Sequence, residues 1–90
     1  MSTGLRIALI GYGRMGREVH EIMRERQWPE PLIIDPRVEH AVPAARDADL
    51  AGIDMCIEFT EPGQAVENIL DALRQNTPVV SGSTGWLDRE

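Results

Sequence analysis

The sequence predicts an α/β domain in which parallel strands alternate with helices. Short apolar runs typical of buried strands occur four times along the 90 residues. Two segments with the apolar spacing of amphipathic helices separate the first strand from the second and the third from the fourth. This alternation favours a parallel sheet, because parallel neighbours need a long crossover connection, usually a helix.

The first half of the chain contains two predicted strands and one helix. Ile7 to Ile10 is an unbroken apolar run, as expected of a strand buried on both faces. Arg14 to Arg26 has helical spacing and ends before Pro29, since proline and its preceding residue disfavour helix. Leu32 to Ile34 gives a second strand, which ends on Asp35. The predicted apolar stripe of the helix comprises Met15, Val19, Ile22 and Met23.

The second half of the chain repeats this pattern after an irregular stretch. Within residues 37–51, only Asp47 to Ala51 is predicted to form a helical turn. Asp54 to Thr60 gives a third strand, and a helix begins near Pro62, where its missing N–H is tolerated. Residues 78–82 give a fourth strand followed by a glycine-rich turn. The predicted apolar face of the second helix comprises Ala65, Val66, Ile69, Leu70 and Leu73.

Composition excludes several classes of function. The net charge is −6 and all nine basic residues are arginine, so no basic stripe for nucleic acid is expected. The absence of lysine excludes a lysine acid or Schiff base in this chain. No run approaches the length of a membrane span, and no signal peptide is recognisable, so we expect a cytoplasmic protein without a membrane partner. One cysteine and no Cys/His cluster argue against a disulfide framework or a metal site.

A glycine-rich turn joins the first strand to the first helix. In Gly11-x-Gly13-x-x-Gly16, the first glycine would permit a tight turn, and the second would permit close approach of a pyrophosphate. Gly16 would let the helix pack on the strand. Because a strand precedes the motif and a helix follows it, the motif predicts a dinucleotide site at the helix N-terminus. The fold class is therefore a Rossmann-like, doubly wound parallel sheet, truncated at about four strands.

Other polar residues follow the strand ends, which meet at one edge of a parallel sheet. Asp35 lies 19 residues after Gly16, near the spacing of an acid that binds the adenosine ribose, although Asp-Pro also opens turns. A carboxylate there favours NAD, whereas Arg37 could pair with the 2′-phosphate of NADP. Ser83 and Thr84 could hold a carboxamide or ribose, or simply form a turn.

Arg14 stands at the helix N-terminus, where a cation opposes the helix dipole unless an anion binds nearby. We therefore expect it to contact a phosphate. Met15 is expected in the core or as a wall on the adenine side. Cys56 is expected to be a small core residue, and His20 to lie on the solvated face of its helix. His40 has no partner visible in the sequence. We see no pair of acid and base residues in this chain that could catalyse a reaction.

Three segments of the chain resemble the dihydrodipicolinate reductases of bacterial lysine biosynthesis. They are Gly11-Tyr-Gly-Arg-Met-Gly16, Glu58-Phe-Thr-Glu-Pro62 and Ser81-Gly-Ser-Thr-Gly-Trp86. The resemblance implies an N-terminal domain, residues 1–90, that binds NADH or NADPH. It also implies a C-terminal substrate domain outside this chain, which would hold a cyclic dicarboxylate and the reacting groups. The whole enzyme would be a homo-oligomer, and this chain alone would be inactive.

The resemblance also implies roles for individual residues. Pyrophosphate contacts are implied for Gly11, Tyr12, Gly13, Arg14, Met15 and Gly16. The adenosine ribose is implied for Asp35, with Arg37 beside it. Contacts at the nicotinamide end are implied for Gly82, Ser83 and Thr84, and Phe59 and Thr60 are implied to lie close to the cofactor. Two alternatives stay open: a cofactor domain of another dehydrogenase, of the amino-acid or homoserine type, and a non-catalytic module that senses NAD(H).

Overall fold

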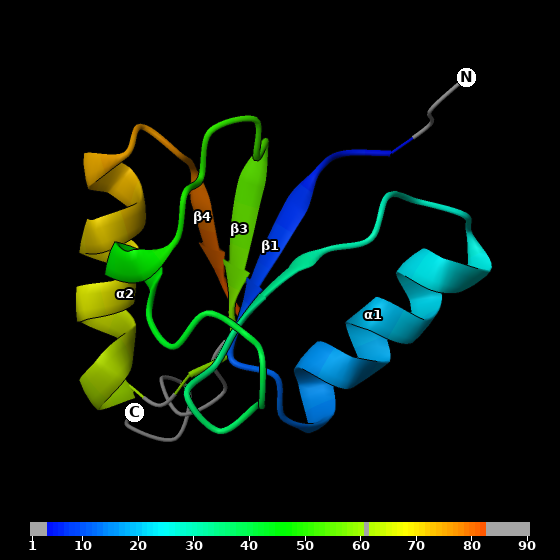
Figure 1. Ribbon diagram of the computed structural model, residues 1–90, viewed down its shortest axis with the longest axis horizontal. Coiled ribbons are helices and arrows are strands. Elements are labelled where there is room, and N and C mark those ends of the chain that lie inside the picture. The colour runs from blue at the N-terminus through cyan, green and yellow to red at the C-terminus, as the bar shows by residue number, and fades with distance from the viewer. Residues whose placement is uncertain (1–3, 61, 83–90) are drawn as a thin grey trace.

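The computed structural model describes residues 4–60 and 62–82 and contains one four-stranded sheet. The strands are β1 (Ile7–Ile10), β2 (Leu32–Ile34), β3 (Met55–Glu58) and β4 (Val79–Ser81). The helices are α1 (Arg14–Glu25) and α2 (Pro62–Arg74), with a short 3₁₀ turn η1 (Ala45–Asp47). All strand pairs are parallel, and the two helices lie on opposite sides of the sheet (Figure 1). The predicted fold class is confirmed.

The order of the strands is β2-β1-β3-β4, so the direction of winding reverses at β1. From β1 the chain passes to β2 on one side and then crosses back to β3 on the other. Ala8 pairs with Leu32 of β2 and with Cys56 of β3. In open α/β sheets, ligands bind beyond the carboxyl ends of the strands at such a switch point. The glycine turn after β1 therefore lies where a ligand site is expected.

Apolar residues of β1 are buried on both faces of the sheet, as its unbroken apolar run predicts. Ala8 and Ile10 belong to the cluster on the α2 side, together with Ala72 and Cys56. Ile7 and Leu9 belong to the cluster on the α1 side, together with Met23. Cys56 is fully buried, which confirms it as a core residue, and burial raises the pKa of its thiol to about 11.

The predicted apolar stripe of α1 is partly wrong. Met23 is buried, but Ile22 is 50% exposed and Met15 is 46% exposed. Consecutive helical residues point about 100° apart, so Ile22 turns away from the sheet when Met23 faces it. Met15 lies in the first turn of the helix, and the expectation that it belongs to the core is wrong.

The predicted apolar face of α2 is also partly wrong. The helix packs through Ala65 and Ala72, which are fully buried and seven residues apart on one side of the helix. Val66, Leu70 and Leu73 are 45–52% exposed. Small side chains allow a helix to approach a sheet closely, whereas the hydrophobic pattern alone favours the larger residues.

The turn expected at Asp47 to Ala51 is wrong in position, because the structure places it at Ala45–Asp47. Ala45 is fully buried, and the amide of Gln75 donates hydrogen bonds to the carbonyls of Ala45 and Ala48, at 3.3 and 3.0 Å. These contacts come from the end of α2, so the local sequence does not reveal them. Among the described residues, no helix is long and apolar enough to span a membrane.

Candidate functional site

The turn after β1 depends on two of its three glycines. Gly11 has φ = +93°, a left-handed conformation that glycine adopts without strain, and a Cβ there would lie 3.1 Å from Thr60 Cγ2. A Cβ on Gly16 would lie 2.5 Å from the carbonyl oxygen of Gly11, too close for any other residue. A Cβ on Gly13 would meet no atom within 4 Å. Gly11 and Gly16 thus shape the turn, while Gly13 leaves open space above it.

The N-terminus of α1 follows directly from this turn. Gly13 precedes the helix and offers no side-chain cap, and no acidic residue lies in the first turn. The first backbone N–H groups of a helix have no partner within the helix, and the helix dipole makes them favourable to an anion. Arg14 is exposed, with its Nε 3.8 Å from a carboxylate oxygen of Glu18. Arg14 is thus the first residue of this helix, and its exposed side chain pairs with Glu18 one turn further along.

Asp35 ties the end of β2 to the glycine turn. Its side chain is 2% exposed, and its carboxylate accepts hydrogen bonds from the backbone N–H of Tyr12 at 2.7 Å and of Arg37 at 2.8 Å. The guanidinium of Arg37 lies 3.3 Å from the same carboxylate. Burial alone would raise the pKa of Asp35, but these hydrogen bonds and the charge of Arg37 together hold it below its ordinary value. Asp35 therefore stays ionised at neutral pH and holds Tyr12 in place.

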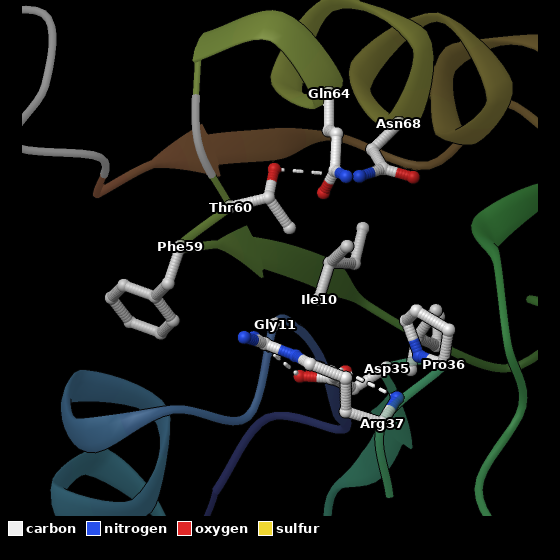
Figure 2. A pocket seen from close by; sticks show the side chains of 10 residues that line it. Ile10, Gly11, Asp35, Pro36, Arg37, Phe59, Thr60, Gln64 and Asn68 are labelled. Carbon is white, nitrogen blue, oxygen red and sulfur yellow. Dashed lines mark hydrogen bonds and ion pairs between the residues drawn. The ribbon is translucent and has the colours of Figure 1, made fainter.

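A pocket of about 440 Å³ lies beyond the carboxyl ends of β1, β2 and β3 (Figure 2). Residues from three strand ends and from α2 line it, as the convergence of parallel strand ends predicts. The lining residues are Ile10, Gly11, Ile34, Asp35, Pro36, Arg37, Phe59, Thr60, Gln64 and Asn68. Five residues predicted for the site, namely Gly11, Asp35, Arg37, Phe59 and Thr60, are therefore brought together.

The other predicted site residues do not line this pocket. Tyr12, Gly13, Arg14 and Met15 form the turn and the start of α1 beside it. Gly82 lies against Phe59, since a Cβ on Gly82 would be 2.7 Å from Cε1 of that ring. Ser83 and Thr84 lie outside the described residues.

Sequence reasoning missed three residues at this site. Gln64 and Asn68 line the pocket and lie four residues apart, hence on one face of α2. This polar spacing directly after the third strand is a signal that could have found them. Glu58, the last residue of β3, is fully buried and accepts hydrogen bonds from Thr60 and Ser81. A charged residue that ends a buried strand is an equivalent signal.

The expectation that His20 lies on a solvated helix face is wrong. His20 is 8% exposed, and its Nδ1 is 2.7 Å from the hydroxyl of Tyr12. Its Nε2 is 3.1 Å from a carboxylate oxygen of Glu30. The guanidinium of Arg24 also lies 3.2 Å from Nε2, so this ring nitrogen faces both a donor and an acceptor, while Nδ1 pairs with the Tyr12 hydroxyl. His20 thus fixes the side chain of a residue in the glycine turn, although the charges around it in the sequence suggest exposure.

We expect His20→Ala to lower the free energy of unfolding by roughly 1–3 kcal/mol, because Tyr12 loses its buried partner. Denaturant unfolding of His20→Ala, Tyr12→Phe and the double variant measures this coupling. The double variant should lose less than the sum of the single losses. Additive losses would contradict the assignment of His20 as the residue that holds Tyr12.

Three features define this chain as an α/β dinucleotide-binding domain. They are the glycine turn at the switch point of a parallel sheet, the helix N-terminus that favours an anion, and the buried acid after β2. Residues 34–90 match the family model described as "Dihydrodipicolinate reductase, N-terminus". The chain belongs to this family, whose N-terminal domain is the part that binds the dinucleotide in NAD(P)-dependent oxidoreductases of lysine and diaminopimelate biosynthesis. The resemblance inferred from the three motifs is confirmed.

Curated relatives agree with this assignment. The chain is 39% identical over 84 residues to the 4-hydroxy-tetrahydrodipicolinate reductase of Christiangramia forsetii, covering 93% of this chain. It is 32% identical over 90 residues to the protein of the same name from Bifidobacterium animalis subsp. lactis, covering 96% of this chain. The match spans 33% of the length of each relative. No solved structure gave a significant match.

Proposed function

We propose that this chain binds NADH or NADPH in the pocket of Figure 2 and presents it for hydride transfer to 4-hydroxy-tetrahydrodipicolinate. The observation that supports this best is the juxtaposition of Asp35, the open space above Gly13 and three strand ends at the switch point. The cyclic substrate would be held by the remainder of a longer reductase, as the names and lengths of the relatives suggest. We further propose that this reductase is homo-oligomeric and cytoplasmic.

The proposal divides the cofactor among parts of the site. The pyrophosphate would lie over Gly13 and receive hydrogen bonds from the first N–H groups of α1, with the charge of Arg14 nearby. The adenosine ribose would lie at Asp35 and Arg37, with Met15 as a wall on the adenine side. The nicotinamide half would extend towards Phe59, Thr60 and the turn at 82–84. When bound, the nicotinamide ring supplies the hydride, and the residues of this chain orient it.

The residues present fit such a ligand in chemical terms. The glycine turn offers N–H donors and a nearby guanidinium for phosphate. The residue Thr60 after β3 offers a hydroxyl, and Gln64 and Asn68 of α2 offer two side-chain amides, for neutral polar groups. Titration of the chain with NADH and NADPH, followed by cofactor fluorescence, tests the proposal. We expect saturable binding of at least one cofactor, and a linear signal without saturation for both would refute it.

We expect Arg37→Ala to weaken binding of NADPH by roughly tenfold and binding of NADH by less than about twofold. The side chain of Arg37 is 81% exposed, so we propose that its guanidinium turns from Asp35 to a 2′-phosphate while the backbone N–H of Arg37 still bonds to that carboxylate. Isothermal titration with each cofactor measures the ratio. An equal loss for both cofactors would show that Arg37 does not read the 2′ position.

A further inference from the structure

Glu58 is a fully buried carboxylate at the end of β3. One of its oxygens, Oε2, accepts a hydrogen bond from the backbone N–H of Thr60 at 2.5 Å and another from the Thr60 hydroxyl. The other oxygen, Oε1, accepts from the hydroxyl of Ser81 at 3.0 Å. Glu58 therefore links the corner after β3 to the end of β4. The hydroxyl groups of Thr60 and Ser81 both donate their hydrogen bonds to it.

These hydrogen bonds determine what Thr60 can offer to the pocket. A hydroxyl has one proton to donate and two lone pairs to accept. The proton of Thr60 points to Glu58, and one lone pair accepts from the side-chain amide of Asn68, at 3.4 Å. Thr60 lines the pocket (Figure 2), so the lone pair that remains can only accept a hydrogen bond there.

The pocket thus has two chemically different ends. At the end of β2, the guanidinium of Arg37 offsets the carboxylate of Asp35, with which it pairs, and can donate hydrogen bonds to an anion. At the end of β3, Thr60 accepts only, and the buried charge of Glu58 behind it disfavours phosphate. Burial raises the pKa of Glu58, and the hydrogen bonds from Thr60 and Ser81 oppose part of that rise. A protonated Glu58 could donate to Thr60, whose own proton would then be free to turn to the pocket.

We propose that Glu58 is a positioning residue that fixes the Thr60 hydroxyl as an acceptor for an N–H or O–H donor on the nicotinamide half of the dinucleotide. This proposal rests on the proposed function, because it assumes that a dinucleotide lies in the pocket. The donor is either the carboxamide N–H or a hydroxyl of the adjoining ribose, which share the same chemistry towards Thr60. Glu58 would thereby help to set which end of the dinucleotide lies at which end of the pocket.

The test compares Glu58→Gln with wild type for binding of NADH and of ADP, which lacks the nicotinamide half. In Glu58→Gln, one carboxylate oxygen is replaced by an NH₂ group, which cannot accept the hydrogen bonds that Thr60 or Ser81 donates. The Thr60 hydroxyl is then no longer held with its proton towards residue 58. We expect NADH binding to weaken roughly tenfold and ADP binding to change less than about twofold. Glu67→Gln, at an exposed position of α2, is the matched control and should change neither.

A pH profile separates positioning from a merely structural role. The pKa of Glu58 is raised by burial, so in wild type the preference for NADH over ADP should fall as the pH is lowered and Glu58 becomes protonated. In Glu58→Gln this dependence should be absent. The double variant Glu58→Gln/Thr60→Val should bind NADH no more weakly than Thr60→Val alone, because both changes remove the same contact.

Several results would overturn the proposal. Unchanged NADH binding in Glu58→Gln, or equal weakening of NADH and ADP, would show that Glu58 does not act through Thr60 on the nicotinamide half. Wild type that binds neither ligand would refute the proposed function instead. If circular dichroism shows that Glu58→Gln is unfolded, Thr60→Val and Thr60→Ser decide with Glu58 in place. Only Thr60→Val should then bind NADH more weakly while binding ADP as wild type does.

Comparing two further ligands shows whether the donor to Thr60 is the carboxamide N–H or a ribose hydroxyl. Nicotinic acid adenine dinucleotide carries a carboxylate in place of the carboxamide and therefore lacks its N–H donors. If Glu58→Gln weakens binding of NAD⁺ but not of this analogue, the donor is the carboxamide. If it weakens binding of both equally, the donor is a ribose hydroxyl. Both results support the proposal, whereas weakening of the analogue alone contradicts it.

Discussion

Gly13→Val should weaken NADH binding by at least roughly 100-fold while leaving the fold intact. A Cβ at this position meets no protein atom within 4 Å, so we expect the free protein to accept the added side chain. It would occupy the space over the N-terminus of α1 into which the proposal puts the pyrophosphate. Loss of two charge-assisted hydrogen bonds to phosphate, at roughly 1.5 kcal/mol or more each, gives the expected factor.

The chain offers a matched control for this variant. Gly63, in the first turn of α2, also has no atom within 4 Å of an added Cβ, so we expect it to accept a valine equally well. Gly63→Val should bind NADH within about twofold of wild type, since the residue does not line the pocket. Fluorescence titration gives the affinities, and circular dichroism confirms that both variants are folded. Tight NADH binding by Gly13→Val would refute the position of the pyrophosphate.

Much of the site could be predicted because it depends on local sequence. The run from Ile7 to Ile10 predicts a strand buried on both faces, and the structure buries it so. The structural need for Gly11 and Gly16 follows from the sharp turn that returns the chain as a helix. Asp35 follows β2 directly, so the parallel arrangement alone brings it to the same edge as the glycine turn. The separate roles of these residues in binding stay predictions.

The features that were missed depend on contacts between distant segments. His20 looks exposed among its charged neighbours, yet Tyr12 from the glycine turn and Glu30 from the segment after α1 both contact it. Glu58 looks like an ordinary strand end, yet Ser81, its neighbour from β4, lies 23 residues away in the chain. Hydrophobic periodicity shows which residues are apolar but not how closely a helix approaches its sheet, and for this reason it failed for α2.

Asp35→Asn is expected to impair both the fold and the site. The carboxylate accepts from Tyr12 and Arg37 through both of its oxygens, whereas an amide can accept through only one. At neutral pH one of these buried donors would face an N–H group, and the free energy of unfolding should fall by roughly 1–3 kcal/mol. The loss of the Tyr12 contact should also loosen the glycine turn and weaken every ligand that binds there.

The effect of pH distinguishes this contact from general destabilisation. The pKa of Asp35 in the fold is lowered below its ordinary value of 3.8, so its contribution to stability is fully present above that pH. The contribution is lost as the pH falls through the lowered pKa, because the folded state must then bind a proton that it disfavours. The difference in stability between wild type and Asp35→Asn should therefore shrink progressively below about pH 4.

Urea unfolding across this pH range measures the difference, with Asp49→Asn as the matched control. Asp49 is exposed and accepts one local hydrogen bond from the backbone N–H of Ala51, so its replacement should cost less than about 0.5 kcal/mol. Binding separates the two roles of Asp35. If the carboxylate acts by holding Tyr12, Asp35→Asn should weaken NADH and inorganic pyrophosphate alike. If it acts only on the ribose, pyrophosphate binding should be unchanged, and the structural role derived from the Tyr12 contact would be wrong.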